Sequence, residues 1–188
     1  MPIRIVPPPV KPPTVEVVGM AGVVTDSDIT ITCVCLDPTK PLGYCSPAGA
    51  VTTTTEGAIP DVYSANFQDY TSWCGEGASS CIFGVGLVFN VSRKPRYAYL
   101  LLDVAWQSGG YGRRLGVAFN RTLLFDTGST VNTNTRIRVN AEVTNLVEVG
   151  ENRVVAGFIL TLTPPAVQAG AMNNGYLKAL TIAVVLVY

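Results

Sequence analysis

Arg136-Ile137-Arg138-Val139-Asn140-Ala141-Glu142-Val143 alternates strictly between polar and apolar side chains. A period of two is typical of a β-strand that has one face in the core and the other in water. The pattern places four apolar side chains inward, at Ile137, Val139, Ala141 and Val143. It turns the intervening polar side chains outward, at Arg136, Arg138, Asn140 and Glu142. This stretch predicts an antiparallel sheet with one solvated face.

Further strand signals run along most of the chain. Residues 29–36 alternate, with Ile29, Ile31, Cys33 and Cys35 on one face. Other runs rich in β-branched and aromatic residues are Val85–Val91, Tyr97–Trp106, Gly116–Phe125, Val154–Leu162 and Leu177–Tyr188. Turn residues separate them, and no stretch has a convincing helical period. About eight strands at this spacing predict an all-β fold, a single jelly-roll-like antiparallel β-sandwich.

The chain is expected to divide into a short N-terminal segment and one domain. We expect residues 15–188 to form one domain, with a long, turn-rich, Cys-containing connection around residues 37–84 that carries one or two short strands. Residues 1–14 hold five prolines between Val6 and Thr14, which makes them stiff and extended. They form either a disordered tail or an arm that lies over a neighbouring subunit. The candidate arm residues are Ile3, Ile5, Val6, Pro7, Pro8 and Pro9.

Composition narrows the classes of function. The 188 residues hold 13 Lys+Arg and 13 Asp+Glu, so the formal net charge is zero, and there is no histidine. A net charge of zero disfavours binding to nucleic acids, and it disfavours binding to a membrane surface through a polybasic patch. The lack of histidine excludes Ser-His-Asp and Cys-His catalysis and His-containing zinc sites. No signal-peptide pattern and no apolar run long enough to span a membrane is visible. We expect no cofactor, no metal, no nucleic-acid partner and no enzymatic activity.

Three stretches in the second half resemble the galactose-binding-domain-like jelly roll. They are Val117-Ala-Phe-Asn-Arg-Thr-Leu-Leu-Phe125, Val143-Thr-Asn-Leu-Val-Glu-Val-Gly-Glu-Asn152 and the apolar run 154–162. Asn120 suits a tight hairpin turn, and Gly150 supplies a positive φ before the chain re-enters the sheet. The family usually has glycine after the asparagine, where this chain has Arg121. The resemblance covers residues 97–162 and implies a β-sandwich that either binds sugars or is purely structural.

One motif raises an enzymatic alternative. Leu123-Leu-Phe-Asp-Thr-Gly-Ser-Thr130 resembles the active-site turn of aspartic proteases, in which two aspartates share a proton. With a single Asp-Thr-Gly, a homodimer would have to supply Asp126 from each chain. The residues after the motif are polar where that fold continues into a buried strand. We therefore interpret Asp126–Ser129 as an ordinary β-turn.

The five cysteines leave three alternatives open. Cys33 and Cys35 lie on one face of a predicted strand, which suits packing better than a mutual disulfide. Cys74 and Cys81 flank a glycine-rich loop that a disulfide would close, and Cys45 is a further candidate. Buried free thiols are the second alternative. A metal site is the third, which the absence of paired Cys-x-x-Cys spacing disfavours.

Aromatic and polar residues near a glycine-rich turn suggest a sugar site. Trp106 and Tyr111 are candidates for stacking on a sugar face, with Gln107 and Arg113 as hydrogen-bond donors. The alternative is that Trp106 belongs to the core beside an ordinary hairpin turn. Asn90 and Asn120 begin glycosylation sequons, which matter only in a glycosylating compartment.

These observations together favour a structural role. We expect a subunit of a large extracellular assembly, most simply a virion protein (capsid, decoration or spike) that self-associates through its termini. Alternatives are a subunit of an archaeal or bacterial surface filament built by strand addition, and a carbohydrate-binding β-sandwich module. The expected partners are copies of the chain, other structural proteins or a glycan, and the expected location is the virion, the cell surface or the extracellular space.

Overall fold

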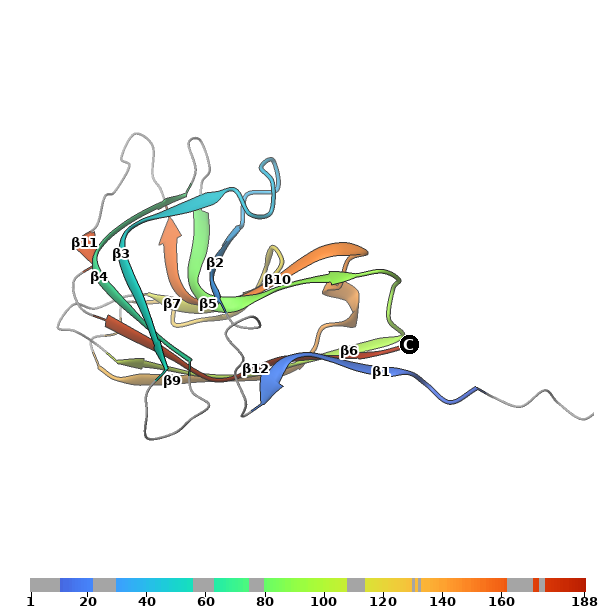
Figure 1. The fold of residues 1–188 in the computed structure, drawn as a ribbon. Coiled ribbons are helices and arrows are strands. Elements are labelled where there is room, and N and C mark those ends of the chain that lie inside the picture. Colours follow the sequence, from blue (N-terminus) through green and yellow to red (C-terminus); the bar gives the residue numbers. More distant parts are fainter. Residues whose placement is uncertain are drawn as a thin grey trace, which may run out of the picture.

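The chain folds into two antiparallel β-sheets that pack face to face (Figure 1). The computed structural model describes residues 11–21, 30–55, 63–74, 80–107, 114–129, 131, 133–161, 171–172 and 175–188. Within these residues, strands dominate and one short 3₁₀ helix, η1 (Thr144–Leu146), follows the alternating stretch. The predicted all-β sandwich is therefore confirmed.

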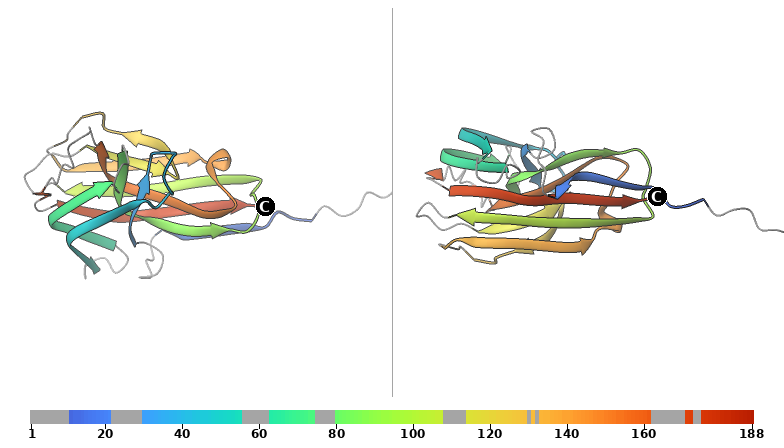
Figure 2. Two further views of the ribbon diagram at one scale, coloured as in Figure 1. Left: turned by 90° about the horizontal axis from the view of Figure 1, so that it is seen from above. Right: turned by 60° about the horizontal axis from the view of Figure 1, so that its bottom comes forward.

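The larger sheet holds seven strands and is built around the last one. Its members are β1 (Val15–Ala21), β3 (Cys45–Thr55), β4 (Tyr63–Cys74), β6 (Tyr97–Gln107), β9 (Thr135–Glu142), β11 (Ala171–Met172) and β12 (Gly175–Val187). β12 pairs with β6 along one edge. Along its other edge, β12 pairs first with β4 and then with β1. Figure 2 shows β1, β12, β6 and β9 side by side in the half of the molecule where the C-terminus lies.

The smaller sheet has five strands in the order β2-β5-β10-β7-β8. Their bounds are β2 (Thr30–Cys35), β5 (Ser80–Val91), β10 (Gly150–Thr161), β7 (Leu115–Phe119) and β8 (Thr122–Asp126). β10 is central and pairs with β5 over its whole length and with β7 over part of it. β7 and β8 form a hairpin that turns at Asn120 and Arg121.

The core lies between the two sheets and is almost entirely apolar. Phe158 of β10 sits near its middle, with ring centroids 5.3 Å from Phe83 and 5.0 Å from Trp106. Inward residues of β6 and β12 meet it from the larger sheet, among them Leu100, Val104, Leu177, Ile182 and Leu186. Burying such side chains contributes roughly 1.5–3 kcal/mol each, so this layer supplies much of the stability.

The alternating stretch behaves as predicted. Ile137 and Val143 are buried, and Val139 and Ala141 are half-buried against the core. The four intervening polar side chains are exposed. The last strand is apolar on both faces. It lies in the middle of its sheet, and the core covers one of these faces.

The region around residues 37–84 differs from the expected loop-rich connection. β3 and β4 are 11 and 12 residues long and pair from Cys45↔Cys74 to Thr55↔Tyr63. The described residues hold twelve strands, against about eight expected, and β3 and β4 are two of the additional ones. Small and polar residues such as Ser46, Pro47 and Ala48 give these strands no alternating hydrophobic signal, so only their pairing reveals them. Pro47 is tolerated because β3 pairs on one side only, with β4, among the described residues.

Candidate functional site

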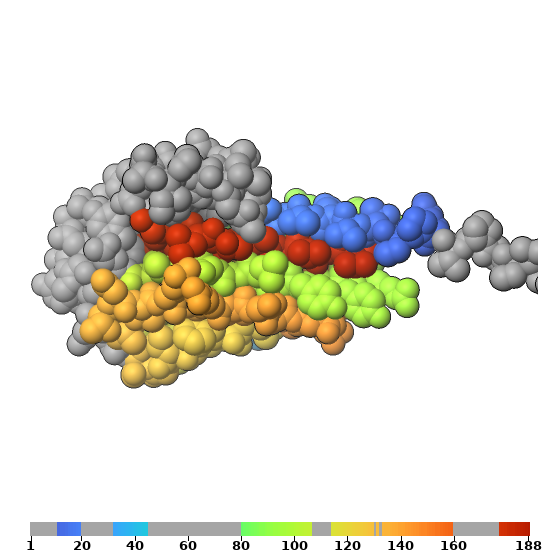
Figure 3. Space-filling view, turned by 90° about the horizontal axis from the view of Figure 1, so that it is seen from below, coloured from blue at the N-terminus to red at the C-terminus, as the bar shows by residue number. Residues whose placement is uncertain are grey.

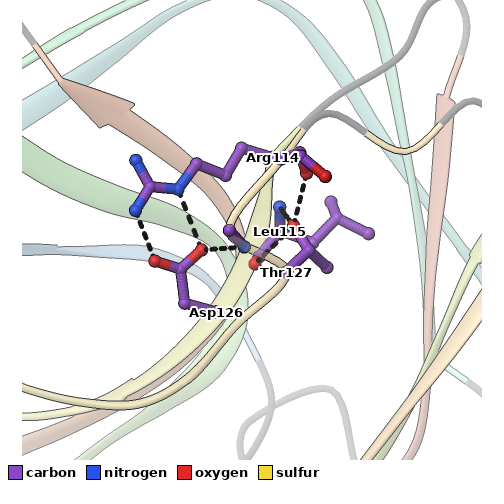
Figure 4. A network of polar contacts seen from close by, with 6 residues as sticks. Arg114, Leu115, Asp126 and Thr127 are labelled. Carbon is purple, nitrogen blue, oxygen red and sulfur yellow. Dashed lines mark hydrogen bonds and ion pairs between the residues drawn. The ribbon is translucent and has the colours of Figure 1, made fainter.

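Asp126 of the Asp-Thr-Gly motif ends β8 and is held by Arg114 (Figure 4). Arg114 donates from Nε to Asp126 Oδ1 at 2.8 Å and from Nη2 to Oδ2. The amide of Gly128, whose φ is +70°, also donates to Oδ1 at 2.8 Å. The hydrogen bonds from Arg114 are the main reason that the pKa of Asp126 is lowered. Arg114 and the Gly128 amide thus engage both oxygens of the carboxylate, which is the geometry of a carboxylate that holds a turn.

Thr127 completes this turn through the backbone of Leu115. Its amide donates to the Leu115 carbonyl at 2.9 Å, and its Oγ1 accepts from the Leu115 amide at 3.1 Å. The side chain thus extends the β7–β8 ladder by one more pair of contacts (Figure 4). Asp126 and Thr127 both fasten the start of β7 to the end of β8.

The residues of the jelly-roll resemblance converge in the fold. Asn120, with φ of 49°, occupies the β7–β8 turn, and Gly150, with φ of 106°, begins β10. Asn120 Nδ2 donates to Asn152 Oδ1 at 3.0 Å and to the Leu146 carbonyl at 2.9 Å. Both asparagine side chains are buried and their polar atoms are paired, so the cluster ties the hairpin to the start of β10. The positive φ expected at Gly150 and the turn expected at Asn120 are confirmed.

Arg121, which departs from the family pattern, has a clear role in this chain. Its guanidinium donates to the carbonyls of Cys35 and Asp37 at 2.9 Å each and to that of Lys40 at 2.7 Å. These carbonyls belong to the turn that follows β2. Arg153 acts alongside it and donates to the Cys33 carbonyl at 3.1 Å. Arg121 thus attaches the end of β2 and the turn after it to the β7–β8 turn, and Arg153 attaches β2 itself to β10.

Trp106 is not a sugar-stacking residue, and that prediction is wrong. Its side chain is 3 % exposed and meets Phe158 edge to face in the core. The signal that selected it, a tryptophan beside a glycine-rich turn, does not tell which face of a strand the ring occupies. Its indole N–H has no hydrogen-bond partner among the described residues. Tyr111, Arg113 and the side chain of Gln107 lie outside the described residues.

The cysteine predictions are only partly covered by the described residues. Cys33, Cys35 and Cys81 are buried; Cys33 and Cys81 are each disulfide-bonded, whereas Cys35 carries a free thiol. The side chains of Cys45 and Cys74 are outside the described residues. Pairing of Cys74 with Cys81 stays a prediction, which peptide mapping without reduction would test.

The two sequons have different accessibility. Asn90, near the end of β5, is exposed. Asn120 is 5 % exposed and both ends of its amide are hydrogen-bonded, to Arg153 N–H and to Asn152 among others. Glycosylation at Asn120 would require breaking this cluster, so in the folded chain it is a structural residue. Asn90 remains the candidate.

The outer face of the larger sheet carries an exposed apolar patch. The pairing register places apolar and aromatic residues of β1, β12 and β6 side by side in two rows. These rows are Val15–Val187–Tyr97 and Val17–Val185–Tyr99. We call these six residues the outer apolar patch. Val15 and Val17 are 58 % and 59 % exposed, and Tyr97 and Tyr99 are 42 % and 38 % exposed. Figure 3 shows the three strands side by side on this face, in blue, red and green.

Polar groups border this patch. Beyond Tyr99 the second row continues to the exposed Glu142 of β9. Farther along β6, Asp103 accepts from Arg136 at 2.7 Å and from Arg138 at 3.2 Å. The hydrogen bond from Arg136 is the main reason that the pKa of Asp103 is lowered. A polar rim around an apolar centre is the general anatomy of an interaction surface.

The sequence predicted two of these strands, within residues 97–106 and 177–188, but neither the strand at residues 15–21 nor this surface. The signal lies in Val15-Glu16-Val17 and in the C-terminal Val-Leu-Val-Tyr run. The C-terminal run was predicted as an ordinary strand, whereas Val15-Glu16-Val17 was not predicted as one. Alternation shows which residues share a face and not whether another layer covers that face. The candidate arm residues Ile3, Ile5, Val6, Pro7, Pro8 and Pro9 lie outside the described residues.

The described part of the chain offers little for other kinds of site. Its side chains form no group of three or more His, Cys, Asp or Glu residues able to hold a metal ion. No helix in the described part has the length and apolar character needed to cross a membrane.

Comparison with known proteins gives distant similarity in fold. No protein-family model and no curated protein sequence matches the chain. Among solved structures, the CBM51 module from Clostridium perfringens in complex with methyl-galactose is 12 % identical, with a TM-score of 0.31 over 79 % of this chain and 99 % of the module. A family 35 carbohydrate-binding module from an environmental isolate is 19 % identical, with a TM-score of 0.26 over 78 % of this chain and 86 % of the module.

Two longer chains are similar at the same distance. An exo-β-1,3-galactanase from Phanerochaete chrysosporium with β-1,3-galactotriose is 14 % identical, with a TM-score of 0.29 over 85 % of this chain. This chain spans 29 % of the length of that enzyme. The structure of infectious bursal disease virus, Gx strain, is 13 % identical, with a TM-score of 0.30 over 80 % of this chain and 39 % of the viral chain. Both are distant likenesses in fold.

Proposed function

We propose that this chain is a non-catalytic structural subunit that associates with further copies in an extracellular assembly, a virion in the first instance. The observation that carries the proposal is the outer apolar patch. Val15 and Val17 are more than half exposed although they stand in a paired strand, and two tyrosines continue their rows. Contiguous apolar surface of this kind marks contacts with other macromolecules.

The charge of the chain supports the same function. Equal numbers of acidic and basic residues, at 14 % of the sequence, leave little electrostatic repulsion between copies. Tyrosine is enriched at protein interfaces because its ring supplies area while its hydroxyl stays hydrated. In a surface filament, the same patch would join subunits in an open, head-to-tail arrangement. In a shell, the arrangement of subunits closes on itself.

The test is the mass of the native protein by light scattering, with negative-stain imaging. Rings, shells or filaments support the proposal, and a monomer at all concentrations contradicts it. Val17→Asp places a charge within the patch and is expected to dissociate the assembly. Val88→Asp is the matched control, because Val88 is 40 % exposed on β5 of the other sheet. Equal effects of both substitutions would argue against the patch.

Glycan binding is the second candidate, and a specific observation favours it. Tyr99 presents a partly exposed ring opposite Glu142, and the next outward position of β6, Leu101, lies opposite Asn140. An aromatic face beside carboxylate and amide groups is suited to stack on a sugar ring and to hydrogen-bond its hydroxyls. A glycan screen that includes galactosides tests this. Binding by a monomer that Tyr99→Ala removes and Trp106→Phe preserves would favour this candidate over assembly.

A further inference from the structure

We propose that residues 3–6 of a second copy add as a strand to the outer edge of β1, so that the arm of one subunit extends the larger sheet of the next. This inference rests on the proposed function and names the partner segment and the place where it binds. Among the described residues, β1 pairs with β12 alone, so its other edge offers backbone groups to a further strand. Extended segments commonly bind exposed sheet edges in this way.

The side-chain pattern of the segment matches that of β1. Ile3-Arg4-Ile5 has two apolar residues around a cation, and Val15-Glu16-Val17 has two apolar residues around an anion. In an antiparallel pairing with Arg4 opposite Glu16, Ile5 faces Val15 and Ile3 faces Val17. Residues directly opposite in a sheet lie on the same face, so each isoleucine extends one row of the outer apolar patch. Arg4 and Glu16 then form an opposite-charge cross-strand pair.

The exposure of β1 agrees with this pairing. Val15, Glu16 and Val17 are all exposed, as are residues 11–14 that lead into the strand. The strand is fixed on its inner edge, where Thr14 and Tyr188 exchange backbone hydrogen bonds at 2.9 and 3.3 Å. An added strand would cover two valines that now face water, and burial of such side chains contributes favourably to association.

The same copy is poorly placed to supply the segment. Residues 7–13 are Pro-Pro-Pro-Val-Lys-Pro-Pro. A tight hairpin needs residues that adopt positive φ, such as glycine or asparagine, and this linker has none. In the extended proline conformation, which rises about 3.1 Å per residue, the linker spans roughly 20 Å. A stiff linker of this length favours pairing of residues 3–6 with another subunit over pairing with their own β1.

Charge reversal in the full-length protein tests the pairing. Arg4→Glu and Glu16→Arg, each alone, are expected to raise the concentration at which half the protein is assembled by at least fivefold. The double variant restores opposite charges and is expected to recover most of the loss. Lys11→Glu is the matched control, because it makes the same charge change in the linker, outside the added strand. Thermal melting of each variant separates loss of assembly from loss of folding.

Each outcome is informative. Recovery in the double variant, with Lys11→Glu near wild type, supports strand addition. If the wild-type protein assembles and Val17→Asp dissociates it, but Ile3→Asp/Ile5→Asp leaves assembly unchanged, strand addition is wrong and the proposed function stands. If the single charge reversals weaken assembly and the double variant does not recover, the Arg4–Glu16 pairing is wrong. A wild-type protein that is monomeric throughout overturns both.

Discussion

Asn120 and Asn152 are joined by a 3.0 Å hydrogen bond between side chains that belong to the β7–β8 turn and to β10. Asn152 also accepts from the amide of Glu148 and donates to the carbonyls of Glu148 and Gly150. Asn120 accepts from the amide of Arg153 at 2.8 Å. Every polar atom of this buried pair is used, which makes it the polar centre of an otherwise apolar end of the sandwich.

Replacing either asparagine should destabilise the fold. In Asn152→Ala, the amide of Glu148 and the Asn120 side chain lose buried partners, and each unpaired group costs about 1–3 kcal/mol. We expect a loss of about 3 kcal/mol in the free energy of unfolding, measured by urea titration. Asn90→Ala, at an exposed asparagine, is the control and should change stability by less than about 0.5 kcal/mol. Similar losses for both would contradict the structural role of the pair.

Asp126→Asn should weaken the fold modestly. The substitution removes the charge that faces Arg114, and we expect a loss of about 1 kcal/mol, kept small because the Arg114 side chain is 40 % exposed to solvent. Thermal unfolding at pH 7 measures it. If a wild-type dimer cleaved peptides at acidic pH and Asp126→Asn abolished the cleavage, the structural interpretation of this residue would fail.

Stability should fall on acidification. The pKa values of Asp103 and Asp126 are both lowered in the folded chain, chiefly by hydrogen bonds from Arg136 and Arg114 respectively. A lowered pKa stabilises the fold above the unfolded value, about 3.9 for aspartate, and this contribution is lost as the pH falls through the folded pKa. Urea titrations between pH 5 and pH 2 should therefore show decreasing stability. In Asp126→Asn the decrease should be shallower, and an unchanged slope would contradict the pairing with Arg114.

Arg121 should be needed to hold the turn after β2. Arg121→Ala leaves the carbonyls of Cys35, Asp37 and Lys40 without this donor. Hydrogen bonds from a charged group contribute about 1.5–3 kcal/mol, and partial solvation of the turn places our expectation near 2 kcal/mol. In this variant, amide hydrogen exchange should become faster than in the wild-type protein, and more so in β2 than in β10. Arg138→Ala, at an arginine whose side chain is 66 % exposed, should leave β2 protected and serves as the control.

Trp106→Ala should damage the core and not a sugar site. Truncation of a buried aromatic side chain typically costs about 3–5 kcal/mol, and Phe158 would lose its edge-to-face partner at 5.0 Å. Chemical denaturation should show a loss in this range. Trp106→Phe keeps most of the apolar volume and should be markedly milder. Retention of wild-type stability in Trp106→Ala would place the ring outside the core.

Local patterns were sufficient for the strand class and for the turns of the jelly-roll motif. The residues along Arg136–Val143 alternate because one face of the strand contacts the core and the other contacts solvent. A single segment is enough to show this pattern. Asn120 and Gly150 were identifiable because their backbone angles favour few residue types. Only one or two short strands were expected where the long β3 and β4 lie, because strands of small and polar residues are stabilised by pairing with each other, which no single segment displays.

The candidate site divides in the same way. By itself, the sequence determined that Tyr97 and Tyr99 stand in a strand, because β-branched and aromatic residues suit the pleated backbone, but it did not identify the strand that holds Val15 and Val17. Only the tertiary structure decided that their rows meet on a face that is partly exposed, and that Trp106 points to the opposite, buried face. The exposure of a side chain depends on whether another layer covers that face of its sheet. Segments far apart in the chain form that layer, so local sequence does not show it. The same holds for Arg121, whose three carbonyl partners lie more than eighty residues away.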